Sequence, residues 1–193
     1  MIIFFMIDYL SILDKYCQGN SELKEILLVH SRQVADRALA ILAAHPQWVD
    51  SGQVDPVFIE EAAMLHDIGV VLCDAPRINC LGTHQYIEHG YLGAEILRQE
   101  GLHKHASVAE RHTGTGITIE QIVREDLPIP LQDYSPRTLE EQLICYADKF
   151  YSKTKLNQDK PYAKIRQHLW KYGSDTVLRF DEMKQLFEPQ MDL

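Results

Sequence analysis

Residues 62–69 (AAMLHDIG) constrain this 193-residue chain more than any other stretch, because an apolar run with helical character ends in an adjacent histidine and aspartate. A buried imidazole and a buried carboxylate each need a partner, since burying an unpaired charge costs several kcal/mol. A metal cation suits both, because it binds neutral imidazole nitrogen and ionised carboxylate oxygen. From the pair alone, a capping or salt-bridged Asp67 beside a core His66 is the simpler interpretation.

Helical periodicity and helix-ending residues dominate the rest of the chain. Asn20 and Asp55 stand where N-caps belong, Pro56 occupies a first helical position, and Gly101 ends a helix. The expected helices cover residues 8–17, 21–45, 56–67, 85–100, 102–112, 138–152, 161–173 and 174–188, with a short helix after Thr118. No alternating run is long enough to predict a strand, so the fold class is all-α.

The length of the chain fits a single domain with a small addition. We expect a main domain at residues 20–155, a short N-terminal helix within 1–19, and a C-terminal helical extension at 156–193 packed on the same domain. The four cysteines form no C-x-x-C pair, which favours reduced thiols over a zinc knuckle or a disulfide framework.

The N-terminus is apolar from Met1 to Ile7 but is far shorter than the roughly 20 residues that span a bilayer. It also lacks the basic region and cleavage site of a signal peptide. We therefore expect a cytoplasmic protein without a membrane partner, with Met6 as a second candidate for the translation start.

The net charge of −9 argues against binding to long nucleic acid. The charge is unevenly distributed, because residues 149–171 carry seven basic residues and one acidic residue. This segment is either a phosphate-attracting surface or a solvated lysine-rich helix face.

Four further residues stand where the His-Asp pair would need ligands. His30 lies on the apolar stripe of a long helix, two glycines clear space around His89, His112 ends a helix before a glycine-rich loop, and Asp148 closes an apolar run. Each has an ordinary structural explanation by itself. Five helices that each place such a group on an inward face together favour a metal site.

The order His30, His66-Asp67, Asp148 resembles the H…HD…D signature of the HD-domain metal-dependent phosphohydrolases, and residues 66–69 look like the HDIG subgroup. The resemblance covers roughly residues 25–155 and implies an all-α HD-domain helical bundle. It implies that His30, His66, Asp67 and Asp148 hold a first metal. It further implies that His89 and His112 hold a second metal with Asp67 bridging, although a mononuclear centre is the alternative.

The expected cofactors are two divalent transition-metal ions, with Fe or Mn favoured over Co, Ni or Zn, because four imidazoles and two carboxylates are ligands of intermediate softness. Two metals about 3.5–4 Å apart share a bridging hydroxide that serves as the nucleophile. The expected catalytic residue is Asp67. The expected partner is a small phosphorylated substrate, such as a nucleotide or a dinucleoside polyphosphate.

Basic residues near the ligands are candidates for binding substrate phosphate. Lys149 and Lys153 rank first, because they lie one helical turn apart, are expected to share a face and begin the basic segment; Arg77 and Arg32 come next. Arg111 adjoins His112. Solvation at the surface explains each of these residues equally well, and a helix-ending turn explains the glycine-rich loop 113–116 as well as phosphate binding does.

The chain departs from many HDIG enzymes at Val70, where those enzymes place a lysine. Either Lys149 takes over that role or the substrate differs. Among the remaining histidines, we expect His45, His103, His105 and His168 at the surface or at helix ends, and His84 as the one that could approach the site.

Two other functional classes fit the same ligand set. Some HD-fold proteins that resemble myo-inositol oxygenase are mixed-valent di-iron oxygenases, and other HD modules serve in signalling without catalysis. The presence of all six ligands disfavours the non-catalytic class. A homodimer is compatible with the sequence.

Overall fold

The computed structural model describes residues 7–190, and their architecture is all-α, as predicted. The α-helices are α1 (Tyr9–Cys17), α2 (Ser21–Ala43), α3 (Pro46–Asp50), α4 (Pro56–Leu65), α5 (His89–Gln99), α6 (His103–Arg111), α7 (Ile119–Glu125), α8 (Leu139–Asp148), α9 (Tyr162–Leu169) and α10 (Ser174–Phe187). Short 3-10 helices are η1 (Ile68–Leu72), η2 (Pro76–Ile78), η3 (Tyr86–Glu88) and η4 (Trp170–Tyr172).

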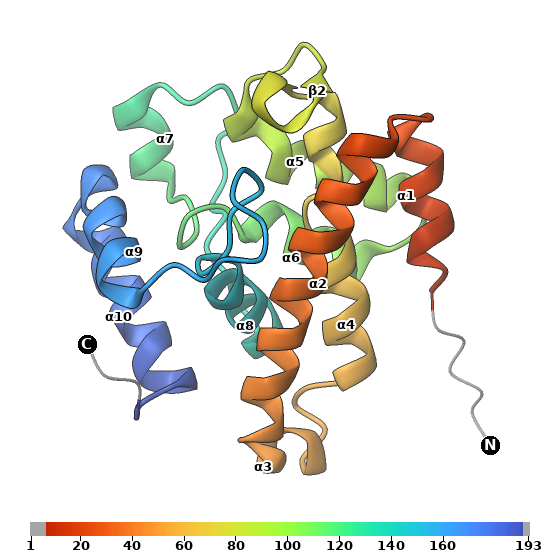
Figure 1. The fold of residues 1–193 in the computed structure, drawn as a ribbon. Helices are drawn as coiled ribbons and strands as arrows, with labels where there is room; N and C mark the ends of the chain where they lie inside the picture. The colour runs from red at the N-terminus through yellow and green to blue at the C-terminus, as the bar shows by residue number, and fades with distance from the viewer. Residues whose placement is uncertain (1–6, 191–193) are drawn as a thin grey trace.

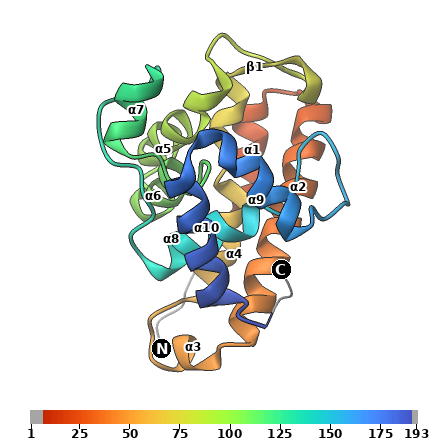
Figure 2. The same ribbon diagram turned by 90° about the vertical axis from the view of Figure 1, so that its left-hand side faces the viewer.

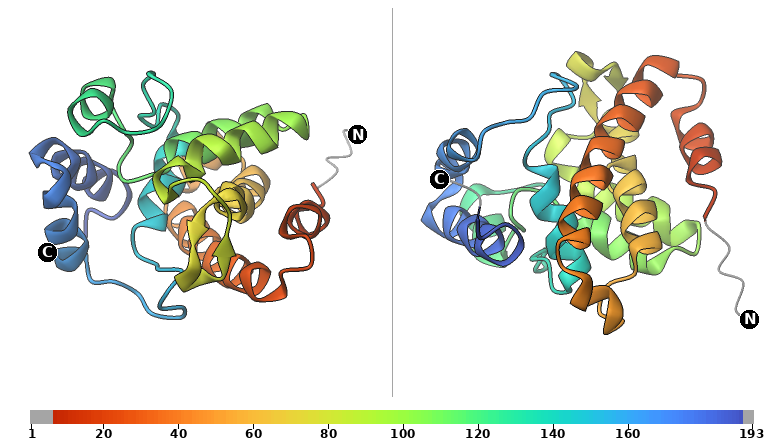
Figure 3. Two further views of the ribbon diagram at one scale, coloured as in Figure 1. Left: turned by 90° about the horizontal axis from the view of Figure 1, so that it is seen from above. Right: turned by 60° about the horizontal axis from the view of Figure 1, so that its bottom comes forward.

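The helices form a bundle around α2 and α4, which lie side by side (Figure 1). The antiparallel pair α5–α6 and helix α8 pack against this centre, and α1 flanks it on the side opposite α9 and α10 (Figures 1 and 2). Figure 3 shows the same order from above, with the α9–α10 layer and α1 at opposite edges of the bundle. The functional side chains come from the helices in the middle.

Side-chain caps begin three of the helices that carry these groups, α2, α4 and α8. The Asn20 side chain accepts a hydrogen bond from the Leu23 N–H at the start of α2, and Asp55 does the same for Val57 at the start of α4. Thr138 caps α8 in a complete capping box with Glu141. These caps fix where each helix begins, and therefore which residues reach the interior.

One apolar core joins the C-terminal helices to the bundle. Tyr146 of α8 packs against Phe180 and Phe187 of α10, with ring centroids 5.5 and 5.6 Å apart. All three rings are buried in the same cluster as the inward side chains of α2 and α4. The C-terminal helices are thus part of the main core.

The structure corrects several expected boundaries. Helix α8 ends at Asp148, so Lys149 and Lys153 do not share a helix face; they lie on the connector that follows. The segment 70–83, which lies between the expected helices 56–67 and 85–100, holds a small antiparallel sheet, in which β1 (Asp74–Ala75) pairs with β2 (Cys80–Leu81). Strands of two residues are too short to show the alternating pattern by which strands are recognised.

His105, expected at the surface or at a helix end, stands in the first turn of α6 but is not at the surface. It is buried on α6, where its Nε2 lies 3.3 Å from a carboxylate oxygen of Glu61 and its ring packs edge-on against Phe58.

The apolar N-terminal stretch and the alternative start at Met6 lie outside the described residues. Within residues 7–190, every helix is too short or too polar to cross a membrane.

Candidate metal centre

Six predicted ligands meet at the centre of the bundle, and each stands at or near a helix end except His30, which lies in the middle of α2. His66 follows the last residue of α4, and Asp67 comes next, before η1. His89 begins α5, His112 follows the end of α6, and Asp148 is the last residue of α8. All are buried except Asp148, which is partly exposed.

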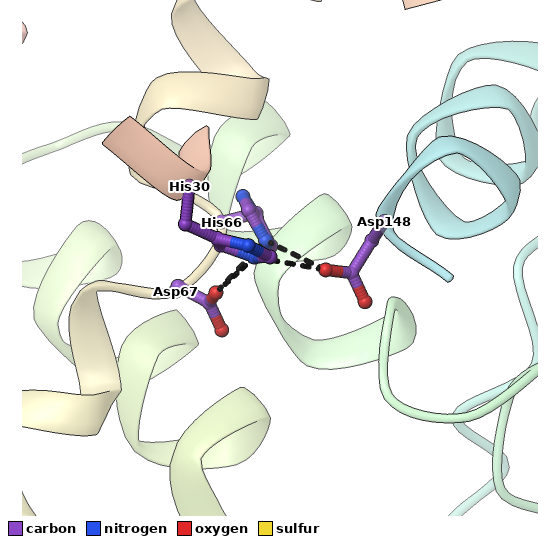
Figure 4. Close-up of side chains that lie close together, drawn as sticks. All are labelled: His30, His66, Asp67 and Asp148. Carbon is purple, nitrogen blue, oxygen red and sulfur yellow. Dashed lines mark ion pairs between the residues drawn. The ribbon is translucent and has the colours of Figure 1, made fainter. Parts of the chain in front are cut away.

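The first group consists of His30, His66, Asp67 and Asp148, whose donor atoms lie within 4.8 Å of one another. His30 Nε2 is 3.1 Å from Asp67 Oδ2 and 3.0 Å from Asp148 Oδ1. His66 Nε2 is 3.0 Å from the same oxygen of Asp67 and 3.5 Å from the same oxygen of Asp148. Figure 4 shows the two imidazoles between the two carboxylates.

The second group consists of Asp67, His89 and His112, also within 4.8 Å of one another. Asp67 Oδ1 lies 3.5 Å from His89 Nε2 and 3.3 Å from His112 Nε2, and the two ring nitrogens are 3.0 Å apart. Asp67 therefore presents one oxygen to each group. This is the arrangement expected of a carboxylate that bridges two metals.

Backbone hydrogen bonds orient three of the four imidazoles. The Nδ1 atoms of His66, His89 and His112 lie 2.6, 2.6 and 2.7 Å from the carbonyl oxygens of Ala63, Tyr86 and Ala109, each three residues earlier in the chain. A proton on Nδ1 donates to that carbonyl and leaves the Nε2 lone pair facing the cluster. This is the form of histidine that binds a metal ion.

Several donor atoms of the cluster lie close together but leave one another without hydrogen bonds. Within residues 7–190, His30 Nε2, His66 Nε2 and both oxygens of Asp67 are buried but form no hydrogen bond of normal geometry. Orphaned buried polar atoms are rare in folded proteins and call for an explanation. Divalent cations provide one, so the residues present fit a metal centre.

Electrostatics keep most of the ligands in the forms that metal binding requires. Burial opposes ionisation of Asp67 and Asp148, but the surrounding positive groups hold the pKa of each carboxyl well below its usual range. Burial lowers the pKa of His112, and burial together with the neighbouring His112 lowers the pKa of His89 to about 3. Burial also disfavours the charged form of His66, yet the adjacent carboxylates raise its pKa to about 9.

A cavity of about 890 Å³ opens onto the cluster and is lined by four of the six ligands, His30, His89, His112 and Asp148. Two lysines from the connector after α8 stand at the cluster itself. Lys153 Nζ lies 2.5 Å from Asp67 Oδ2. Lys149 Nζ lies 2.7 Å from Asp148 Oδ2 and donates to the carbonyl of His112 at 3.0 Å.

The other predicted phosphate-binding residues divide into two sets. Arg77 lines the cavity from η2. Arg32 instead pairs with Asp36 and Glu60, and neither it nor Arg111 lines the cavity. Arg111 pairs with Glu110 and Glu141. The structure therefore does not bring Arg32 or Arg111 to the cavity, because carboxylates of neighbouring helices hold both.

The glycine-rich loop 113–116 also lines the cavity. Arg179 of α10 anchors the loop by donating to the carbonyls of Thr115 and Gly116, at 3.2 and 3.3 Å. Thr113 Oγ1 lies 3.5 Å from His89 Nε2. The C-terminal extension thus supports the wall of the site.

Tyr86, Lys160 and His168 are among the cavity residues that the sequence pattern did not single out for the site. The Tyr86 ring stacks on the His89 imidazole, with centroids 4.7 Å apart. Lys160 and His168 belong to the basic segment 149–171, which was the available signal for them. His84 pairs with Glu88 instead of lining the cavity. Val70 is buried in the apolar core, so position 70 does not face the cavity.

This all-α fold with its buried His/Asp cluster agrees with the comparisons with known proteins. The HD domain family matches residues 27–152, and the chain therefore belongs to that family. No solved structure matches the chain.

Three relatives illustrate the range of similar proteins. An uncharacterized protein of Methanocaldococcus jannaschii is 39% identical over 76% of this chain and 75% of its own length. A tRNA (cytidine(56)-2'-O)-methyltransferase of Thermoplasma volcanium is 33% identical over 66% of this chain and 32% of its own. The same enzyme of Picrophilus torridus is 33% identical over 68% and 34%. The chain thus spans about a third of the length of either methyltransferase.

Proposed function

We propose that this protein is a metal-dependent phosphohydrolase with a binuclear centre. The observation that carries the proposal is the position of Asp67, which presents one oxygen to His30 and His66 and the other to His89 and His112. Divalent ions held there supply Lewis acidity, which lowers the pKa of water and neutralises charge on a phosphoryl group. Fe or Mn suits the mixed nitrogen and oxygen ligands.

The residues around the centre orient a phosphoester. Lys153 and Lys149 place two ammonium groups beside the carboxylates, where they attract phosphoryl oxygens and stabilise the charge of the transition state. Thr113 adds a hydroxyl at the second group of ligands. Five of the six candidate ligands are buried, and burial strengthens these electrostatic interactions.

The substrate class we propose is a small phosphoester of the nucleotide type. The cavity volume of about 890 Å³ lies within the range of small-molecule sites, and apolar and aromatic side chains such as Ile117, Leu127 and Tyr172 line the part that the charged groups leave free. Two relatives bear names of tRNA-modifying enzymes, which makes nucleotides released from RNA reasonable compounds to test.

The test is phosphate release by purified protein loaded with Mn or Fe, with p-nitrophenyl phosphate and a nucleotide panel as substrates. The assay is run under nitrogen and in air. Release without oxygen supports the phosphohydrolase. Oxygen uptake without phosphate release would overturn it in favour of a di-iron oxygenase.

A further inference from the structure

A third lysine of the cavity differs from the two at the cluster. Lys149 and Lys153 have carboxylate partners, Asp148 and Asp67. Lys160 also lines the cavity, yet its side chain has no hydrogen-bond or ion-pair partner anywhere in residues 7–190. Its backbone is nevertheless held in place, because its backbone N–H donates to the carbonyl of Phe150 at 2.7 Å.

The surroundings of Lys160 favour an anion. Burial lowers the pKa of Lys160 to about 8, and the charges of Lys149 and Lys153 contribute to this decrease against the attraction of Asp148. A half-buried cation next to like charges gains from any anion that enters the cavity. Glu125, a carboxylate of the same cavity, is already paired with Arg124 at 2.9 Å.

His168 lines the same cavity as Lys160. Burial and the charge of Lys171 are the two largest causes that lower the pKa of His168. The charges of Lys160 and Lys149 lower it further, so these groups are close enough to influence one another. The imidazole lines the cavity and its ring packs edge-on against Tyr172. An anion bound by Lys160 would favour the protonated imidazole and gain a second donor.

We infer that Lys160, assisted by His168, forms a second anion subsite in the cavity, separate from the phosphoryl site at the metal ligands. This inference rests on the proposed function and extends it: the substrate carries at least one further phosphate group beyond the one attacked. Lys149 and Lys153 serve the reacting phosphoryl group, and Lys160 selects for the second phosphate.

The test compares the affinities of orthophosphate, pyrophosphate and tripolyphosphate for Mn-loaded protein by calorimetry. In the wild type, affinity increases with the number of phosphates. Lys160→Met removes this increase. It weakens tripolyphosphate binding roughly tenfold, which is the size expected for one charge-assisted hydrogen bond. Its affinity for orthophosphate changes less than about twofold. Lys160→Arg retains most of the increase.

Lys164→Met is the matched control, because Lys164 lies exposed on α9 and does not line the cavity. It leaves all three affinities unchanged. A wild type that binds the three phosphates equally, or a Lys160→Met variant that retains the increase, would overturn the inference. Affinity and phosphate release are read out separately. If the increase in affinity depends on Lys160 but the protein releases no phosphate from any substrate, the proposed hydrolysis is refuted and the anion subsite is retained.

Discussion

The two carboxylate oxygens of Asp67 face different pairs of imidazoles, and this single side chain therefore links the two groups of ligands. Its neighbour His66 serves only the first group, through Nε2. Adjacent residues at the end of α4 can reach the same centre because the helix ends at Leu65, which frees Asp67 from helical geometry.

Substitution of Asp67 tests whether its carboxylate bridges two metals or binds only one. Asp67→Asn keeps the size of the side chain but removes its charge, and we expect loss of both metals and a decrease in activity of at least about a hundredfold. His89→Ala should lose one metal and keep the other. Metal analysis of the purified variants measures this, with Asp74→Asn at the exposed rim of the cavity as the control. Full metal content in Asp67→Asn would contradict bridging.

Lys153 lies closest to the centre among the cavity lysines. Lys153→Met should decrease kcat/KM for phosphoesters by roughly 10²–10³, because it removes a preorganised charge from a buried site. Lys155→Met alters an exposed lysine of the same connector and should change kcat/KM less than about twofold. Equal effects of the two substitutions on steady-state kinetics would argue for a general effect of surface charge.

At the scale of elements, the site depends on the contact of η1 with α5. A Cβ atom on Gly69 would lie 2.0 Å from the carbonyl oxygen of His89 and 2.3 Å from the backbone nitrogen of Gly93. Only glycine permits this approach, which brings Asp67 and His89 together. On Gly93 itself, the nearest atom to a Cβ is the Gly69 nitrogen, at 3.0 Å.

Alanine substitutions test this contact in a graded way. We expect Gly69→Ala to destabilise the protein by about 3 kcal/mol or more, because backbone must move, and Gly93→Ala by roughly 1–2 kcal/mol. Urea unfolding of the metal-free proteins measures both values. If Gly93→Ala destabilised the protein more than Gly69→Ala, the backbones of η1 and α5 would separate easily at this contact.

The contact between α4 and α6 predicts a pH dependence of stability. Burial lowers the pKa of His105 below its ordinary value of 6.5, despite the adjacent Glu61. Protonation of His105 therefore favours the unfolded chain. The free energy of unfolding has its full value with respect to His105 above pH 6.5 and decreases as the pH falls below 6.5. His105→Gln should lose less stability between pH 7.5 and 5.5 than the wild type or the exposed control His103→Gln, as measured by urea midpoints.

At the scale of the whole molecule, α9 and α10 share the core of the bundle and also supply cavity residues. We expect Phe180→Ala to cost about 3–5 kcal/mol, whereas the exposed Leu178→Ala costs less than about 0.5 kcal/mol. Unfolding followed by fluorescence and by circular dichroism should give one coincident transition. Two separate transitions would mean that the C-terminal helices fold independently.

The convergence of the six candidate ligands could be predicted because histidine and aspartate stand out on apolar helix faces and at helix ends. The lysines were predicted for an incorrect reason: α8 ends at Asp148, and the connector, not a helix face, places Lys153 at the cluster. Pairing of Arg111 with Glu141 depends on helix packing, which local patterns do not contain. The same holds for Lys160, whose place in the cavity follows from the course of the connector.

The connector between α8 and α9 contains Lys149, Lys153 and Lys160, whereas the six candidate metal ligands all come from residues 30–148. The candidate centre and the lysines of its cavity are therefore encoded by separate, contiguous parts of the chain. Under the proposed function, exchange of the connector for one with another length or charge pattern would redirect the same centre to a different phosphoester without altering a candidate ligand.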